Sequence, residues 1–213
     1  MNQGMISGSI VRVEDKSQAA GFPACIVTIA GETHRENKPL VYFEQIRVSG
    51  HTATAALALQ SGDAVLFDQA VIEQQTWVER ASNEPRAQLV VRGLSMTRLR
   101  GTTSKMMGEH RVLLQAVNSF TIRGRLADAP KMKTVGATTV TEGAIVVNLP
   151  EGRSSATRPH YLKVESWGHT PMSGQAKGVV TVAEVLVKTD SAMIDGKKRY
   201  FTVLEARSSA VLA

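Results

Sequence analysis

One short pattern occurs twice in this chain, and it restricts the folds that the chain can adopt. Residues 42–53 read YFEQIRVSGHTA, and residues 160–171 read HYLKVESWGHTP. Both contain an aromatic residue, alternating aliphatic residues and then Gly-His-Thr, and the two Gly-His-Thr triplets lie 118 residues apart. A recurrence at this distance indicates one domain copied in tandem. A length of 213 residues suffices for two domains of roughly 100 residues each.

Both copies are dominated by predicted β-strands. Apolar residues alternate with polar ones or form short runs, which are the patterns of half-buried and buried strands. The strands are expected at 5–14, 24–31, 42–50, 64–74 and 87–96 in the first half, and at 119–128, 143–150, 161–168, 179–188 and 199–207 in the second.

A single helix is expected between the third and fourth strands of the first half. Residues 52–63 are rich in Ala and Leu, with Thr52 as a candidate cap and Gly62 as a stop. The corresponding segment 170–178 contains Pro and Gly and predicts a loop. Five strands with an insertion after the third are typical of the OB-fold barrel. We therefore expect an all-β chain of two tandem five-stranded OB-fold barrels, although strand count alone leaves other small barrels and sandwiches open.

The expected domains are residues 1–99 and 112–213, joined by a basic linker at 100–111. The linker's cations can follow a phosphate backbone or simply be solvated. The formal charge of +6 divides into −1 for residues 1–99 and +7 for residues 100–213. A basic half suggests a polyanionic partner such as nucleic acid, with solubility as the alternative explanation.

Several classes of protein are disfavoured by the sequence. Cys25 is the only cysteine, which excludes an intrachain disulfide and a Cys-rich zinc site, and we expect it to be a buried small hydrophobic residue in a reducing cytoplasm. No apolar run approaches the ~20 residues of a membrane-spanning helix, and no secretory signal is recognised. The five His residues are scattered, and neither a phosphate-binding loop nor a nucleophile elbow is present. We expect no catalytic residue, no metal ligand, no cofactor and no enzymatic activity.

The repeated strands place aromatic and basic side chains on one face. Alternation sends Leu162 and Val164 inward and sends Tyr161, Lys163 and Trp167 outward. In the first copy the same phase sends Ile46 and Val48 inward and Phe43, Gln45, Arg47 and Ser49 outward. Such a face can stack unpaired bases while cations neutralise phosphates. Packing of these aromatics against a neighbouring loop or a partner chain is the alternative.

The order of these features resembles the bacterial single-stranded DNA-binding protein family. In the second half, NSFTIRGRLADAPKMK resembles that family's opening strand, HYLKVESWG its third strand, and DGKKRYFTVLEA its closing hairpin. In the first half, YFEQIRVSG, the helix at 52–63, IEQQTWVER and RAQLVV resemble the third strand, the following helix and the last hairpin. The resemblance places stacking aromatics at Tyr161 and Phe43 in the third strands, at Trp167 before the strand-ending Gly, and at Trp77 in the hairpin. The first copy has Ser49 where the second has Trp167, and the second has Ser191 or Ala192 where the first has Trp77.

The resemblance implies sequence-independent binding and protection of single-stranded DNA in replication, recombination or repair. It also implies a homodimer, because two chains would supply four OB domains, and a cytoplasmic, nucleoid-associated location. The sequence ends EARSSAVLA and shows no acidic run of the family's kind, so we expect no recruitment of partner proteins through an acidic tail. The candidate DNA-binding residues are Phe43, Arg47, Trp77, Arg80, Arg86, Arg123, Arg125, Lys131, Lys133, Tyr161, Lys163, Trp167, Lys197, Lys198, Arg199 and Tyr200. An accessory protein that acts through protein–protein contacts, or an RNA binder, remains as an alternative.

Overall fold

A computed structural model describes residues 1–213 except 36–37, 80–82, 151–155, 169, 195 and 213. By their contacts the residues form two compact units. Unit 1 comprises 1–3, 72–89 and 120–213, and unit 2 comprises 4–71 and 90–119. The chain therefore passes back and forth between the units, and each is described separately below.

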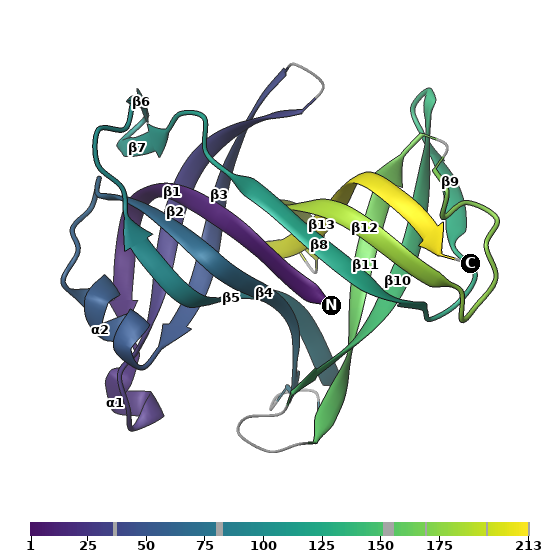
Figure 1. The fold of residues 1–213 in the computed structure, drawn as a ribbon, viewed down its shortest axis with the longest axis horizontal. Helices are drawn as coiled ribbons and strands as arrows, with labels where there is room; N and C mark the ends of the chain where they lie inside the picture. The colour runs from purple at the N-terminus through teal and green to yellow at the C-terminus, as the bar shows by residue number, and fades with distance from the viewer. Residues whose placement is uncertain (36–37, 80–82, 151–155, 169, 195, 213) are drawn as a thin grey trace. The chain divides into compact units, whose positions relative to one another are not determined.

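Unit 2 contains a closed five-stranded barrel (Figure 1). Its strands pair in the order β1-β2-β3-β5-β4, and β4 pairs back onto β1. The β3–β5 pairing is parallel, whereas β1 pairs antiparallel with β2 and β4. The five strands are β1 (Asn2–Asp15), β2 (Ala24–Arg35), β3 (Lys38–Ser49), β4 (Ala64–Val78) and β5 (Pro85–Arg98).

Unit 1 repeats this topology. Its strands pair in the order β8-β10-β11-β13-β12, and β12 closes onto β8. The β11–β13 pairing is again the parallel one. The strands are β8 (Asn118–Leu126), β10 (Thr138–Pro150), β11 (Thr157–Trp167), β12 (Val180–Ile194) and β13 (Lys197–Leu212). The expectation of an all-β chain with tandem OB-fold barrels is confirmed.

The predicted helix is present as α2 (His51–Leu57), between β3 and β4. Its cap was predicted wrongly. Gly50, with φ of 62°, is the N-cap, while the Thr52 hydroxyl is buried and donates to the Leu94 carbonyl of β5 over 3.0 Å. The helix ends at Leu57, so Gly62 lies in a later turn. The corresponding segment of unit 1 forms turns, as its Pro and Gly residues predict.

Four further elements were not expected. The helix α1 (Ser17–Ala20) lies between β1 and β2, and the strand β9 (Lys131–Val135) pairs with β10. The hairpin β6 (Ser104–Met107) and β7 (His110–Leu113) lies in and just beyond the segment expected to be a linker. There Lys105 pairs with Glu32 of β2, so its charge is partly offset. The domain bounds 1–99 and 112–213, with a linker at 100–111, stay a prediction.

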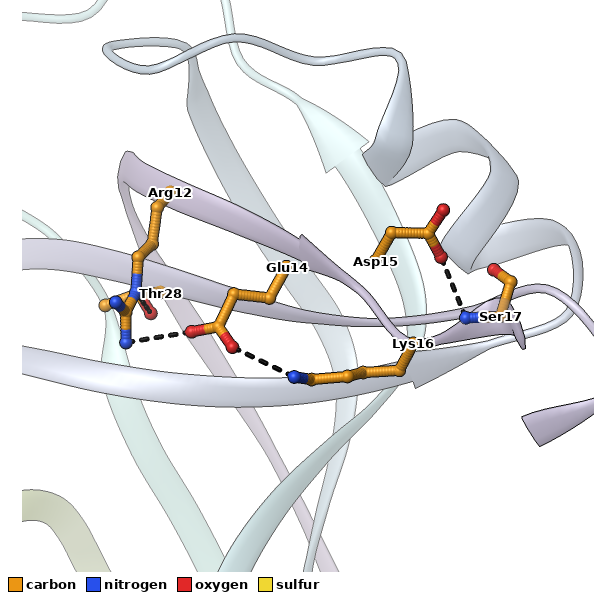
Figure 2. Close-up of polar contacts among 6 residues, drawn as sticks. All are labelled: Arg12, Glu14, Asp15, Lys16, Ser17 and Thr28. Atoms are coloured by element: carbon orange, nitrogen blue, oxygen red, sulfur yellow. Dashed lines mark hydrogen bonds and ion pairs between the residues drawn. The ribbon is translucent and has the colours of Figure 1, made fainter. Parts of the chain in front are cut away.

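Figure 2 shows how polar side chains organise the end of β1. Glu14 accepts from Arg12 over 2.8 Å and from Lys16 over 3.2 Å, and Arg12 also reaches Thr28 of β2. The Ser17 N–H donates to an Asp15 carboxylate oxygen over 2.8 Å. Hydrogen bonds from Ser17 lower the pKa of Asp15. The Asp15 carboxylate thereby satisfies the first backbone donor of α1.

Each barrel has an apolar core built from alternate strand positions. Ile6, Ile29 and Ile46 are fully buried in unit 2, as are Phe120 and Ile122 in unit 1. Cys25 is also buried, as expected, and burial together with the nearby Asp15 charge raises the pKa of its thiol to about 11. Within the described residues, none of the helices has the length and apolarity needed to cross a membrane.

Candidate nucleic-acid interface

The outward face of β11 carries the strongest candidate residues. Leu162 and Val164 are fully buried, while Tyr161 is 47% exposed and Lys163 is exposed as well. The predicted phase of this strand is therefore confirmed, because side chains alternate strictly between core and surface. Trp167 follows the same phase, but it is half-buried whereas Tyr161 is exposed. A smaller fraction of its ring is therefore open to a base.

Small and aliphatic residues of β10 lie beside these side chains. Val146 pairs with Tyr161, and Ala144 pairs with Lys163. Directly opposite residues of an antiparallel pair project from the same face. Neither Val146 nor Ala144 rises as high as a tyrosine or a lysine, so the ring and the ammonium project from a low surface.

A groove with a volume of about 790 Å³ adjoins Tyr161 and is called the Tyr161 groove. Its walls include Arg123 and Arg125 of β8 and Lys177 of the loop before β12. The Arg125 guanidinium donates to the Gly178 carbonyl over 2.9 Å, which fixes its direction. Asp128 also lines the groove, and its carboxylate lies 3.6 Å from the Lys177 ammonium. Both side chains are exposed, so this ion pair contributes little to stability. The groove therefore combines one aromatic ring with an excess of positive charge.

Gly124 explains why β8 and β10 approach closely at this groove. A Cβ at this position would overlap the Val146 carbonyl oxygen and would lie 2.9 Å from the carbonyl carbon. Only glycine allows this crossing, at which Arg125 pairs with Val146. The crossing places the arginines of β8 next to the strand that pairs with Tyr161.

A second groove of about 490 Å³ lies farther along the same face and is called the Phe201 groove. It is lined by Lys131 of β9, Lys163 of β11 and Phe201 of β13, together with Glu142 and Glu165. Phe201 is 41% exposed and was missed by the sequence analysis, which selected the neighbouring Tyr200. Strict alternation predicts that only one of these two neighbours is exposed. Both are exposed, because they come before Leu204, where β13 begins to pair with β11.

Several predicted residues lie in unit 1 outside both grooves. Lys133 forms an ion pair with Glu142, and this hydrogen bond raises the pKa of Lys133. Lys198 lies 5.4 Å from the ring centroid of Tyr200, within cation–π range, near the tip of the β12–β13 hairpin. Lys197 and Arg199 lie in β13, with side chains outside the described residues.

The β4–β5 hairpin carries three more candidates. Trp77 is 43% exposed at the end of β4. Arg86 of β5 contacts Glu79 over 2.8 Å and Glu84 over 3.1 Å, so its charge is largely compensated. Arg80 lies outside the described residues.

In unit 2 the predicted phase of β3 is also confirmed. Ile46 and Val48 are buried, and Phe43 and Arg47 are half-buried on the opposite face. The Phe43 ring is not open, because the His110 ring of β7 meets it edge-on at a centroid distance of 5.7 Å. The β6–β7 hairpin thus covers part of the first copy's predicted stacking position.

Rings and cations are the chemistry that this face presents. Within the described residues, no group of three or more His, Cys, Asp or Glu could hold a metal ion. Exposed rings flanked by cations on a barrel strand can stack bases of any sequence while neutralising phosphates. The fold and this face define a tandem OB-fold protein with an aromatic and cationic strand surface.

Comparison with solved structures agrees with this class. The chain is similar to the wild-type single-stranded DNA-binding protein of Thermus aquaticus, with a TM-score of 0.76 and 18% identity over 100% of this chain and 93% of that chain. A deletion variant of the same protein gives a TM-score of 0.75 and 20% identity over 100% of this chain and 95% of that chain. The resemblance seen in the sequence is thereby confirmed at the level of the fold. No family model and no curated protein sequence matches the chain.

Proposed function

We propose that this protein binds single-stranded DNA without sequence preference, and that unit 1 provides most of the binding surface. The observation that carries the proposal is the Tyr161 groove, where an exposed tyrosine lies among Arg123, Arg125 and Lys177. The full-length structural likeness to a single-stranded DNA-binding protein supports it.

The chemistry of the face favours a single strand over a duplex. Tyr161 can stack only on a base whose face is open, and duplex bases are already stacked on each other. Stacking contributes roughly 1–3 kcal/mol per base, and phosphate contacts to Lys and Arg add a term that weakens with salt. The Phe201 groove adds an exposed ring and two lysines to the same face, but Asp128, Glu142 and Glu165 line it as well, so the Tyr161 groove supplies the positive surface for phosphates.

A titration tests this proposal. Oligo-dT should quench the fluorescence of Trp77 and Trp167 and should bind far more tightly than duplex DNA, with affinity falling steeply as salt rises. Equal affinity for oligo-dT and duplex would refute stacking. Tighter binding of oligo-U than of oligo-dT would point to RNA, and no binding of any oligonucleotide would point to an accessory protein that acts through protein contacts.

We further propose that the protein protects single strands during replication, recombination or repair, near the nucleoid, and that it has no catalytic activity of its own. A homodimer would bring together four barrels. Light scattering at micromolar concentration, with and without oligo-dT, tests the assembly, and a monomer under both conditions would contradict it.

A further inference from the structure

The beginning of β11 is held by the end of β4. The Gln74 backbone N–H donates to His160 Nδ1 over 2.8 Å, and the Tyr161 N–H donates to Gln74 Oε1 over 3.3 Å. The Arg158 guanidinium donates to Thr76 Oγ1 over 2.6 Å. The two segments run in opposite directions, and all five residues belong to unit 1.

These contacts cover a strand edge that the barrel leaves open. On one side β11 pairs with β10 over its whole length, with Tyr161 opposite Val146. On the other side, among the described residues, β13 pairs with Val164, Glu165 and Ser166. The Gln74 side chain therefore gives the Tyr161 N–H an acceptor within the protein, and this hydrogen bond ties the beginning of β11 to β4. The stacking residue of the proposed site is thus positioned by a residue from the other repeat.

The contact with His160 requires an unprotonated Nδ1. A ring nitrogen accepts a hydrogen bond only when it carries no proton, so the charged imidazolium cannot accept from Gln74. His160 is 8% exposed, and burial is the main reason that its pKa is lowered. Glu73 of β4 opposes this shift and Arg158 of β11 adds to it, while β10 presents the apolar Val147 opposite.

We propose that Gln74 and His160 are positioning residues for Tyr161, and that protonation of His160 releases the beginning of β11 and weakens nucleic-acid binding. This inference rests on the proposed function. The direction of the pH dependence follows from the lowered pKa of His160. The contact contributes fully above the ordinary His pKa of about 6.5 and is lost as the pH falls through the lowered value.

Four variants separate this role from a general structural one. His160→Asn places an amide oxygen near the position of Nδ1 and does not titrate. Gln74→Ala removes the acceptor for Tyr161, whereas Gln74→Glu keeps one. Gln88→Ala is the matched control, because Gln88 is exposed on β5 of the same hairpin.

The readout is the affinity for labelled oligo-dT, measured by fluorescence anisotropy between about pH 7.5 and about pH 5.5. Wild-type affinity should fall about three- to ten-fold more than that of His160→Asn over this range, as expected for the loss of one hydrogen bond. At neutral pH, Gln74→Ala should lose a similar factor and Gln88→Ala should bind like wild type, while Gln74→Glu, which keeps the acceptor but adds a negative charge, should approach wild-type affinity as the salt concentration rises. Identical pH profiles for wild type and His160→Asn, or equal affinities for Gln74→Ala and Gln88→Ala, would overturn the proposal.

Amide hydrogen exchange without DNA distinguishes this failure from failure of the proposed function. After correction for intrinsic rates, protection of the Gln74 and Tyr161 amides should fall in acid in wild type but not in His160→Asn. A chain that shows this change but binds no single strand contradicts the proposed function. A chain that binds a single strand without this change contradicts the positioning role.

Discussion

Replacing Gly124 by alanine should destabilise unit 1 strongly. The new Cβ would overlap the Val146 carbonyl oxygen and would lie 2.8 Å from the Ile145 side chain. The oxygen belongs to the backbone of β10, so no rotamer change relieves the overlap and the two strands must separate. Overpacking costs typically 1–3 kcal/mol, and a rigid backbone partner places this site at the upper end. Alanine's lower backbone entropy returns at most about 1 kcal/mol. The net loss of unfolding free energy should be about 2–3 kcal/mol.

Gly143→Ala supplies the matched control in the neighbouring strand. Its Cβ would meet nothing closer than the Pro130 ring at 3.5 Å, an ordinary contact, and neither glycine has a positive φ. Trp77 and Trp167 both belong to unit 1, so urea unfolding followed by tryptophan fluorescence reports on that unit. The unfolding free energy of Gly143→Ala should stay within about 0.5 kcal/mol of the wild-type value. Gly124→Ala should lose about 2–3 kcal/mol, and in a thermal scan its melting temperature should fall by roughly 10–20 °C. Equal stabilities for the two variants would refute the account of the strand crossing.

Three other perturbations test the site and the cores. Tyr161→Ala should weaken oligo-dT binding by roughly 1–3 kcal/mol in anisotropy titrations, while Tyr161→Phe should retain most of the affinity; equal losses would exclude ring stacking. Glu205→Gln should cost about 3 kcal/mol in urea unfolding, since Glu205 is 3% exposed and accepts from Lys188 over 2.7 Å; a loss below about 1 kcal/mol would contradict a tightly coupled pair. Cys25 should react with a thiol reagent at pH 8 only after unfolding, because its pKa is about 11 and it is buried; rapid reaction of the native protein would contradict this burial.

The barrels could be predicted because their signal is local. Alternation with a period of two residues is written into each strand, so the inward Leu162 and the outward Tyr161 follow from the sequence itself. The helix at 51–57 was found for a similar reason, from its Ala-rich composition. Its cap was not, because the Thr52 hydroxyl bonds to a strand more than forty residues away.

The parts that were missed depend on distant partners. The strand β9 has only exposed positions, so no apolar pattern marks it and pairing with β10 alone defines it. His110 covers Phe43 although neither residue carries a local sign of the other. Likewise, nothing near Gln74 indicates that its partners are His160 and Tyr161. The sequence was enough to name the candidate rings, but it could not show which of them are exposed to a ligand and which are covered by other side chains.

The exchange of residues 72–89 into unit 1 has a consequence for synthesis on the ribosome. Gln74 and His160 are separated by 86 positions in the chain. At about 5–20 residues per second, roughly 4–17 s pass between their emergence. During that interval unit 2 can close its own barrel and β4 can pair with β5, but Gln74 and Thr76 at the end of β4 lack the partners that β11 supplies. Chaperones that hold apolar hairpins would meet this segment first, and a stalled or truncated chain would present it permanently.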